Sequence, residues 1–397
     1  MLEKNLKYDF ETVINRTNTG SAKWELMKSW NPKVSDGTVP FSVADMEFKN
    51  APEIIEGLKT FIDYTVLGYT EPTENYLRSV CSWMKRRHYW DIKSEWIVES
   101  PGVVPAFFSA IKALTEPGDG IIIMTPVYYP FYMAMERNNR TIIKNQLIKK
   151  EDTYDIDFED LELKAKNPKA KILLFCSPHN PIGRVWSKAE LERVGEICLR
   201  NNILIISDEI HFDIIMPGFK HRVFATISEE LSNNMIICTA PSKTFNLAGL
   251  QVSNIIIPNK QIREAYVKEA QSNAFVSLNI LGYKGCEIAY NEGESWLEEL
   301  INVIYHNHLV LKKYIEENIP KIKVFDLQGT YLQWMDFNGL GLNKDELEKL
   351  LHEAKLFFDE GYVFGEEGIG FERMNLACPT NVLFNALEKL RKLIDRN

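Results

Sequence analysis

The stretch that decides the fold is KILLFCSPHNPIGRVWSKAELERVGEICLRNNILIISDEIH, residues 171–211. Its two short apolar runs, residues 171–176 and 203–207, enclose a helical pattern at residues 188–201. Ser187, with Glu190 three residues later, matches a capping box, which predicts a helix start at this point. Short apolar runs that do not alternate with polar residues are typical of strands buried on both faces. The stretch therefore predicts a strand–helix–strand unit with parallel strands.

Working outward, the same kind of apolar run recurs at residues 120–124, 235–239 and 253–257. Helical patterns separate several of these runs, so the sequence predicts an α/β protein with a mainly parallel sheet covered by helices. From the first run to the last, this region forms the larger part of the chain. We assign residues 46–290 to one large domain.

The pattern changes after about residue 260, where a long helix-compatible region reaches residue 290. A second helical region follows, and looser strand and helix patterns come after it. These patterns predict a smaller α+β domain over residues 291–397. The first 45 residues are expected to form an arm that packs on the rest of the chain. The elements expected in the smaller domain are a helix at 295–318, antiparallel strands at 323–325 and 331–337, and helices at 345–358 and 382–395.

Composition limits the classes of partner. The 397 residues contain 46 Lys and Arg against 55 Asp and Glu, a net charge of -9, and 45% are hydrophobic. The hydrophobic share favours a globular protein over a disordered one. The acidic balance argues against nucleic acid or an anionic membrane as the partner, because both require a basic face.

Targeting and redox signals are also weak. The N-terminus lacks the apolar core of a signal peptide, and no run approaches the roughly 18 apolar residues of a membrane span. The six cysteines are scattered without metal-ligand or redox spacing. We therefore expect reduced thiols in a cytoplasmic protein.

Polar residues follow the predicted strands, at the edge where open α/β sheets bind ligands. Lys243 comes shortly after a buried strand among small polar residues, where a desolvated amine loses its charge readily and can attack a carbonyl group. Taken alone, it also fits a surface lysine on a loop. Asp208 ends another strand, where an unpaired carboxylate is costly and a cationic partner is expected. Taken alone, it also fits a turn or a helix N-cap.

Three such segments together resemble a known superfamily. Asn180 precedes Asp208 by 28 residues, and Asp208 precedes Lys243 by 35. The segments Asn-Pro-Ile-Gly at 180–183, Ser-Asp-Glu-Ile-His at 207–211 and Ser-Lys-Thr-Phe-Asn at 242–246 resemble those of the fold-type I pyridoxal phosphate enzymes. That resemblance, to the aspartate aminotransferase superfamily, spans nearly the whole chain. It implies a large domain with a mainly parallel seven-stranded sheet and a smaller α+β domain.

The resemblance also implies roles for residues. Lys243 would hold pyridoxal 5'-phosphate covalently and carry protons to and from the substrate. Asp208 would pair with the pyridinium nitrogen, and Asn180 would donate a hydrogen bond to the phenolic oxygen. Tyr128 would stack on the ring, although a Tyr in an apolar run is more often a core residue. Arg373 would bind the substrate α-carboxylate through two parallel hydrogen bonds.

The phosphate group would rest at a helix start. By the same resemblance, its partners would be the backbone N–H groups of Gly102, Val103 and Val104 and the hydroxyl group of Ser242. Many aminotransferases have an arginine eight residues after the lysine, but this chain has Gln251 there. A different residue must supply the interaction with the phosphate group that the arginine makes in those enzymes.

Further segments narrow the resemblance to cystathionine β-lyases of the MalY/PatB type. His211 replaces a tyrosine that is common in aminotransferases, and it fits a cofactor contact or a packing residue. Members of that group are homodimers in which a partner tyrosine reaches the phosphate, a role that Tyr69 would fill. The segments that carry the likeness are 20–25, 41–48, 68–70, 177–181 and 240–249.

The implied reaction is α,β-elimination of L-cystathionine, or of L-cysteine or cystine, to a thiol, pyruvate and ammonia. Two other functions fit the same sequence. An aminotransferase of class I or II would share every cofactor residue. The second alternative is a regulatory protein of the same fold. The lack of a basic helix-turn-helix segment ahead of the fold argues against this alternative.

Overall fold

The computed structural model describes residues 6–35, 38–272, 274 and 277–395. Its centre is a seven-stranded sheet in the order β1-β9-β8-β7-β6-β2-β3. The neighbours from β8 to β3 run parallel, whereas β9 is antiparallel to both β8 and β1. The strands are β1 (Ile97–Ser100), β2 (Gly120–Thr125), β3 (Thr141–Gln146), β6 (Ala170–Cys176), β7 (Leu204–Asp208), β8 (Met235–Thr239) and β9 (Ser253–Ile256). The predicted mainly parallel seven-stranded sheet is confirmed.

The central sheet is buried on both faces, which explains its isoleucine-rich strands. Alternate residues of one strand enter different cores: Ile122 packs in the larger core, and Ile121 in the other. The helices around this sheet are α2 (Pro52–Tyr64), α3 (Glu74–His88), α4 (Val103–Leu114), α5 (Pro130–Arg137), α6 (Phe158–Ala165), α7 (Lys188–Arg200), α8 (Glu229–Ser232), α9 (Pro241–Thr244), α10 (Lys260–Ser272) and α11 (Ile280–Glu292). The capping box predicted at Ser187 is present at the start of α7.

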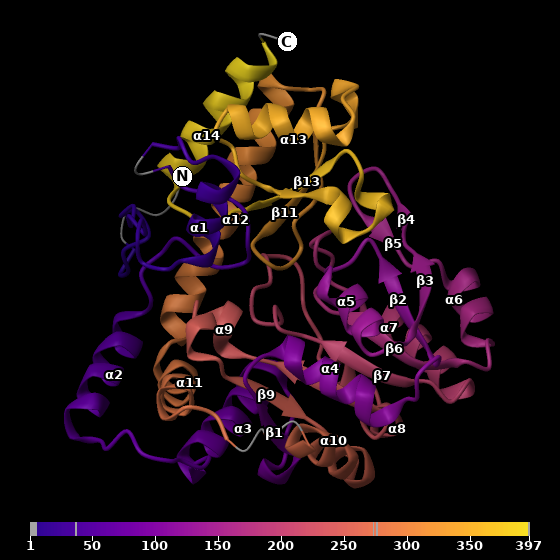
Figure 1. Ribbon diagram of the computed structural model, residues 1–397. Coiled ribbons are helices and arrows are strands. Elements are labelled where there is room, and N and C mark those ends of the chain that lie inside the picture. Colours follow the sequence, from indigo (N-terminus) through magenta and orange to yellow (C-terminus); the bar gives the residue numbers. More distant parts are fainter. Residues whose placement is uncertain (1–5, 36–37, 273, 275–276, 396–397) are drawn as a thin grey trace.

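A second, four-stranded antiparallel sheet has the order β10-β11-β13-β12. It lies with its helices at the upper end of the molecule in Figure 1, above the central sheet. Its elements are α12 (Glu294–Asn318), β10 (Lys323–Val324), β11 (Leu332–Asp336), α13 (Lys344–Glu353), β12 (Asp359–Glu360), β13 (Phe371–Asn375) and α14 (Thr380–Ile394). A separate hairpin pairs β4 (Ile148–Lys149) with β5 (Tyr154–Asp155).

The N-terminal segment packs on the rest of the chain. Tyr8 and Phe10 belong to the larger core, and Trp24 of α1 (Ala22–Trp30) packs with Phe357. Figure 1 shows α1 and α14 at the same end of the molecule. The domain limits at residues 45 and 290 stay predictions. Within the described residues, no helix combines the length and apolarity needed to cross a membrane.

Two predicted helices differ from the structure. The pattern at 260–290 forms two helices, because Asn279 caps a new one by accepting from the Gly282 N–H group. The helix expected at 345–358 ends at Glu353. Lys355 there has a left-handed backbone (φ 59°), so the apolar run that follows leaves the helix and enters the core.

Candidate active site

Three neighbouring parallel strands bring the predicted residues to one edge of the central sheet. Asn180 lies on the segment after β6, Asp208 ends β7, and Lys243 lies on the short helix α9 after β8. All three line one cavity of about 180 Å³. Six more predicted residues line the same cavity: Gly102, Val103, Val104, Tyr128, His211 and Ser242.

Lys243 points its amino group to a backbone carbonyl. Its Nζ donates a hydrogen bond to the Ala44 oxygen over 2.6 Å. Burial lowers the pKa of the Lys243 amino group to about 8, although the Asp45 carboxylate acts in the opposite direction. The amine is therefore available in its neutral, nucleophilic form at far lower pH than an ordinary lysine.

Asp208 is buried without a cation. Its side chain is 4% exposed, and among the described residues no lysine or arginine lies within ion-pair distance of it. The Ile210 N–H group donates to Oδ1 over 3.2 Å. Burial nevertheless raises the pKa of the carboxyl group to about 7. Within the described residues, therefore, no side chain is the cationic partner expected from the sequence.

Arg373 links the two sheets at the site. It lies on β13, and its Nη1 donates to Asn180 Oδ1 over 2.8 Å. Its Nε and Nη2 donate to Asp359 Oδ2 of β12 over 3.1 and 2.5 Å. Arg373 itself is not among the residues that line the cavity, but its contact with Asn180 brings it to the cavity wall.

His211 and Tyr128 form further walls. His211 is 3% exposed, and its Nδ1 has no hydrogen-bond partner in the described part of the chain. Burial, with the charges of Lys243 and Arg373, lowers the pKa of its imidazole group. The Tyr128 N–H group donates to the Asn180 carbonyl over 3.1 Å, so two walls of the cavity are tied together.

The start of α4 faces the same cavity. Gly102 is the N-cap residue and provides no side-chain cap, so the first N–H groups of this twelve-residue helix stay free for an anion. Gln251 also lines the cavity, at the position where many aminotransferases have an arginine. The cavity therefore offers an amine, a carboxylate and an anion cradle together.

Tyr69 does not lie with the other predicted cofactor-binding residues. Its side chain is fully exposed, and it does not line the cavity of its own chain. It follows α2 in a segment that exposes other large apolar side chains, namely Tyr64, Val66 and Leu67. Its role at a partner's site stays a prediction.

Two contacts at the site were not predicted from the sequence. The Ala44 carbonyl accepts from Lys243 and also from the Tyr331 hydroxyl group over 2.9 Å. The segment 41–48 was recognised as a motif, but nothing in it indicated a backbone acceptor. Asp359, the partner of Arg373, carries no motif at all.

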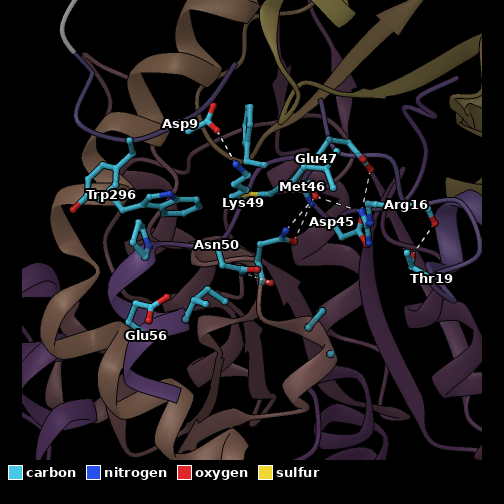
Figure 2. A pocket seen from close by; sticks show the side chains of 18 residues that line it. Asp9, Arg16, Thr19, Asp45, Met46, Glu47, Lys49, Asn50, Glu56 and Trp296 are labelled. Atoms are coloured by element: carbon cyan, nitrogen blue, oxygen red, sulfur yellow. Dashed lines mark hydrogen bonds and ion pairs between the residues drawn. The ribbon is translucent and has the colours of Figure 1, made fainter. Parts of the chain in front are cut away.

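A buried charge network supports the segment that carries Ala44. Lys23 Nζ lies 3.0 Å from Glu47 Oε1 and 3.5 Å from Asp45 Oδ1. Arg16 pairs with the same two carboxylates, over 3.0 Å to Glu47 and 2.9 Å to Asp45. Figure 2 shows Arg16, Asp45 and Glu47 on one side of a neighbouring cavity of about 670 Å³. The network fixes the backbone on both sides of Asp45.

Comparisons with known proteins agree with this geometry. The family described as Aminotransferase class I and II matches residues 38–390. Cystathionine beta-lyase PatB of Bacillus subtilis (strain 168) is 39% identical over 384 residues, which cover 96% of this chain and 99% of that protein. Protein MalY of Escherichia coli (strain K12) is 33% identical over 384 residues, with 95% and 96% covered.

A solved structure is also similar. Cystalysin from Treponema denticola, whose crystal structure contains a pyridoxal 5'-phosphate cofactor, is 52% identical to this chain. The TM-score is 0.97, and the match covers 98% of this chain and 100% of that one. The similarity therefore includes both sheets and the segments between them.

Proposed function

The chain belongs to the class I and II aminotransferase family, and from this premise we propose that it is a pyridoxal phosphate-dependent carbon–sulfur β-lyase. It would convert L-cystathionine and water into homocysteine, pyruvate and ammonia, and L-cysteine and water into sulfide, pyruvate and ammonia. The observation that carries the proposal is the single cavity that joins Lys243, Asp208 and Asn180. The similar protein named cystathionine beta-lyase PatB supports the choice of reaction, and the similar cystalysin, which contains pyridoxal 5'-phosphate, supports the choice of cofactor.

The cavity suits this cofactor in two ways besides the presence of Lys243. The unpaired Asp208 carboxylate would meet the ring nitrogen and keep it protonated. The free N–H groups at the start of α4 would bind the phosphate, together with Ser242. When bound, pyridoxal phosphate supplies an electron-withdrawing ring that stabilises negative charge on the substrate α-carbon.

Lys243 has two tasks in this proposal. Its Nζ would bind the cofactor covalently, and once displaced by the substrate amine it would accept the α-proton. An amine with a pKa of about 8 suits both tasks, because it exchanges a proton near neutral pH. The same Nζ would return a proton to the leaving thiolate.

Arg373 would bind the substrate carboxylate. Its guanidinium is 2% exposed, and Asp359 and Asn180 hold it in one orientation. A fixed arginine presents two parallel N–H donors to a carboxylate. His211 and Tyr128 would contact the cofactor ring from the cavity walls.

We also propose a homodimer in which the partner subunit supplies Tyr69 to the phosphate. The exposure of Tyr69 and of the apolar side chains next to it supports this assignment, because such a patch on a monomer marks an interaction surface. The six cysteines, all free thiols, suit a reducing compartment such as the cytoplasm.

The experiment is to give the purified, cofactor-loaded protein L-cystathionine alone and to measure pyruvate and thiol. The lyase produces both in equal amounts over many turnovers without an added 2-oxo acid. An aminotransferase depends on that acceptor, so strict dependence would contradict the proposal. Lys243→Ala should be inactive, whereas Lys260→Ala, an exposed lysine on α10, serves as the matched control.

A substrate series then defines specificity. L-cystathionine, L-cystine and L-cysteine would be assayed side by side, with kcat/KM compared for each. The comparison ranks them by transition-state binding, which is the quantity that defines preference between substrates.

A further inference from the structure

A cluster of three side chains lies outside the candidate active site. Glu348 and His352, four residues apart on one face of α13, meet Glu360 of β12. Each offers one ligand atom, and these atoms lie within 4.8 Å of one another. His352 Nε2 and Glu360 Oε1 are 3.3 Å apart. In the described residues, this is the one group of three or more His, Cys, Asp or Glu side chains that meets this geometry.

A buried carboxyl group adjoins the cluster without a partner. Glu372 of β13 pairs directly with Glu360 of β12, so both side chains project from the same face of the sheet. Glu372 is 3% exposed, and no hydrogen-bond donor or cation contacts its carboxyl group within the described part of the chain. Burial, followed by the charges of Glu360, Asp359 and Glu348, raises the pKa of this carboxyl group. A cation bound next to Glu372 would stabilise the ionised form of this carboxyl group.

Neighbouring residues hold the cluster in place. The Tyr362 hydroxyl group donates to Glu348 Oε2 over 3.0 Å. The His352 ring stacks on Trp30 of α1, with ring centroids 5.0 Å apart, and lies 5.3 Å from Phe357. Such contacts orient the ligands of a metal ion before it binds.

We propose that Glu348, His352 and Glu360, with the buried Glu372 beside them, form a binding site for one divalent first-row transition-metal ion of the Mn²⁺ or Zn²⁺ type. One imidazole nitrogen with carboxylate oxygens is a donor set that suits these ions, whereas Ca²⁺ takes oxygen ligands alone. The ion offsets the negative charges of Glu348 and Glu360 and joins α13 to β12.

The proposed metal site and the Arg373–Asp359 pair lie on opposite faces of the same two strands. Asp359 pairs with Arg373 one residue along from the Glu360–Glu372 pair, so the two pairs face opposite sides of the sheet. A bound ion therefore holds β12, the strand that carries Asp359, the partner of Arg373. Its role is structural, and the proposal does not depend on the reaction that the enzyme catalyses.

The test uses the full-length, cofactor-loaded protein after chelator treatment, with Mn²⁺ as the probe, because Mn²⁺ prefers oxygen and nitrogen ligands to cysteine thiolates. Titration followed by electron paramagnetic resonance should show one Mn²⁺ bound per chain, and thermal unfolding should move to higher temperature. Glu360→Gln and Glu348→Gln should each weaken binding at least about tenfold.

Controls separate this site from other sites. Glu353→Gln changes a charge on the same helix and should bind Mn²⁺ as the unmodified protein does, because Glu353 is 65% exposed and its ion pair within the described residues is with Lys349 at 3.9 Å. Glu348 is less buried than Glu360, so its variant keeps the test open if Glu360→Gln fails to fold. Absence of saturable binding, or equal binding in Glu348→Gln, would overturn the proposal.

Discussion

At the scale of single residues, the site depends on two groups whose buried positions move their pKa values toward each other. Burial raises the pKa of Asp208 to about 7 and lowers that of Lys243 to about 8. Lys243 and Asp208 were predicted from the sequence because each lies at the end of a buried strand, at the binding edge of the sheet, whereas Asn180 was predicted only from the resemblance to a known superfamily. The Ala44 carbonyl and Asp359 were not predictable, since a backbone acceptor and a lone carboxylate leave no pattern in one sequence.

The lowered pKa of Lys243 predicts how cofactor uptake depends on pH. Only the neutral amine attacks the cofactor carbonyl, so its uptake rate by the apoprotein should rise with pH and level off above about 8. An unperturbed lysine would give a rise that continues to about 10.4. Stopped-flow absorbance between pH 6 and 10 measures the rate, and a rise that persists beyond pH 9.5 would contradict the assignment.

Asp208 can be tested by removing its charge alone. Asp208→Asn keeps the shape of the side chain but takes away the negative charge expected to face the ring nitrogen. The kcat for pyruvate formation should fall by about 10² to 10³. Asp152→Asn, an exposed loop residue, is the control. An Asp208→Asn enzyme within tenfold of full activity would rule out this role.

At the scale of elements, the five inner strands of the central sheet were the most predictable feature, since apolar, mostly isoleucine-rich runs define them, whereas the outer strands β1 and β3 were not among the predicted runs. Helix ends were less predictable. The apolar residues at 356–358 continue the helical pattern of α13, but a left-handed backbone at Lys355 turns them into the core. The contacts of the segment 41–48 were also hidden, because they come from residues far away along the chain.

The charge network beneath that segment gives a stability prediction. Glu47→Gln leaves Lys23, which is 1% exposed, and Arg16 with fewer negative partners. Removing one member of such a buried group should lower the free energy of unfolding by about 3 kcal/mol. Denaturant unfolding measures this change.

The matched control for this variant lies on the same helix as Lys23. Glu25 is exposed, and Glu25→Gln should change the free energy of unfolding by no more than about 0.5 kcal/mol. Equal stability of Glu47→Gln and Glu25→Gln would show that the network contributes nothing.

At the scale of the whole molecule, the two sheets and their order along the chain were predictable, whereas the assembly was not. Tyr69 lies outside its own cavity, and the sequence placed it at a partner's site only by resemblance to a family. One chain carries no pattern that reports which surface meets a second copy. The exposed residues around Tyr69 are the physical sign of such a surface.

Subunit mixing tests the shared site. Tyr69→Phe and Lys243→Ala homodimers should each have little activity, but a mixed dimer contains one intact site. Random reassortment of equal amounts should therefore restore about one quarter of full activity, because half of the dimers are mixed and each has one good site of two. Tyr64→Phe mixed in the same way is the control, and activity that never exceeds the sum of the parents would argue against Tyr69.

The account rests most directly on one atom, the Nζ of Lys243. Reduction of the cofactor-loaded protein with borohydride fixes the cofactor to the amine that holds it, and peptide mapping by mass spectrometry then identifies that residue. The account predicts one cofactor per chain, attached at Lys243. A label on another lysine, or no label on a protein saturated with cofactor, would contradict it.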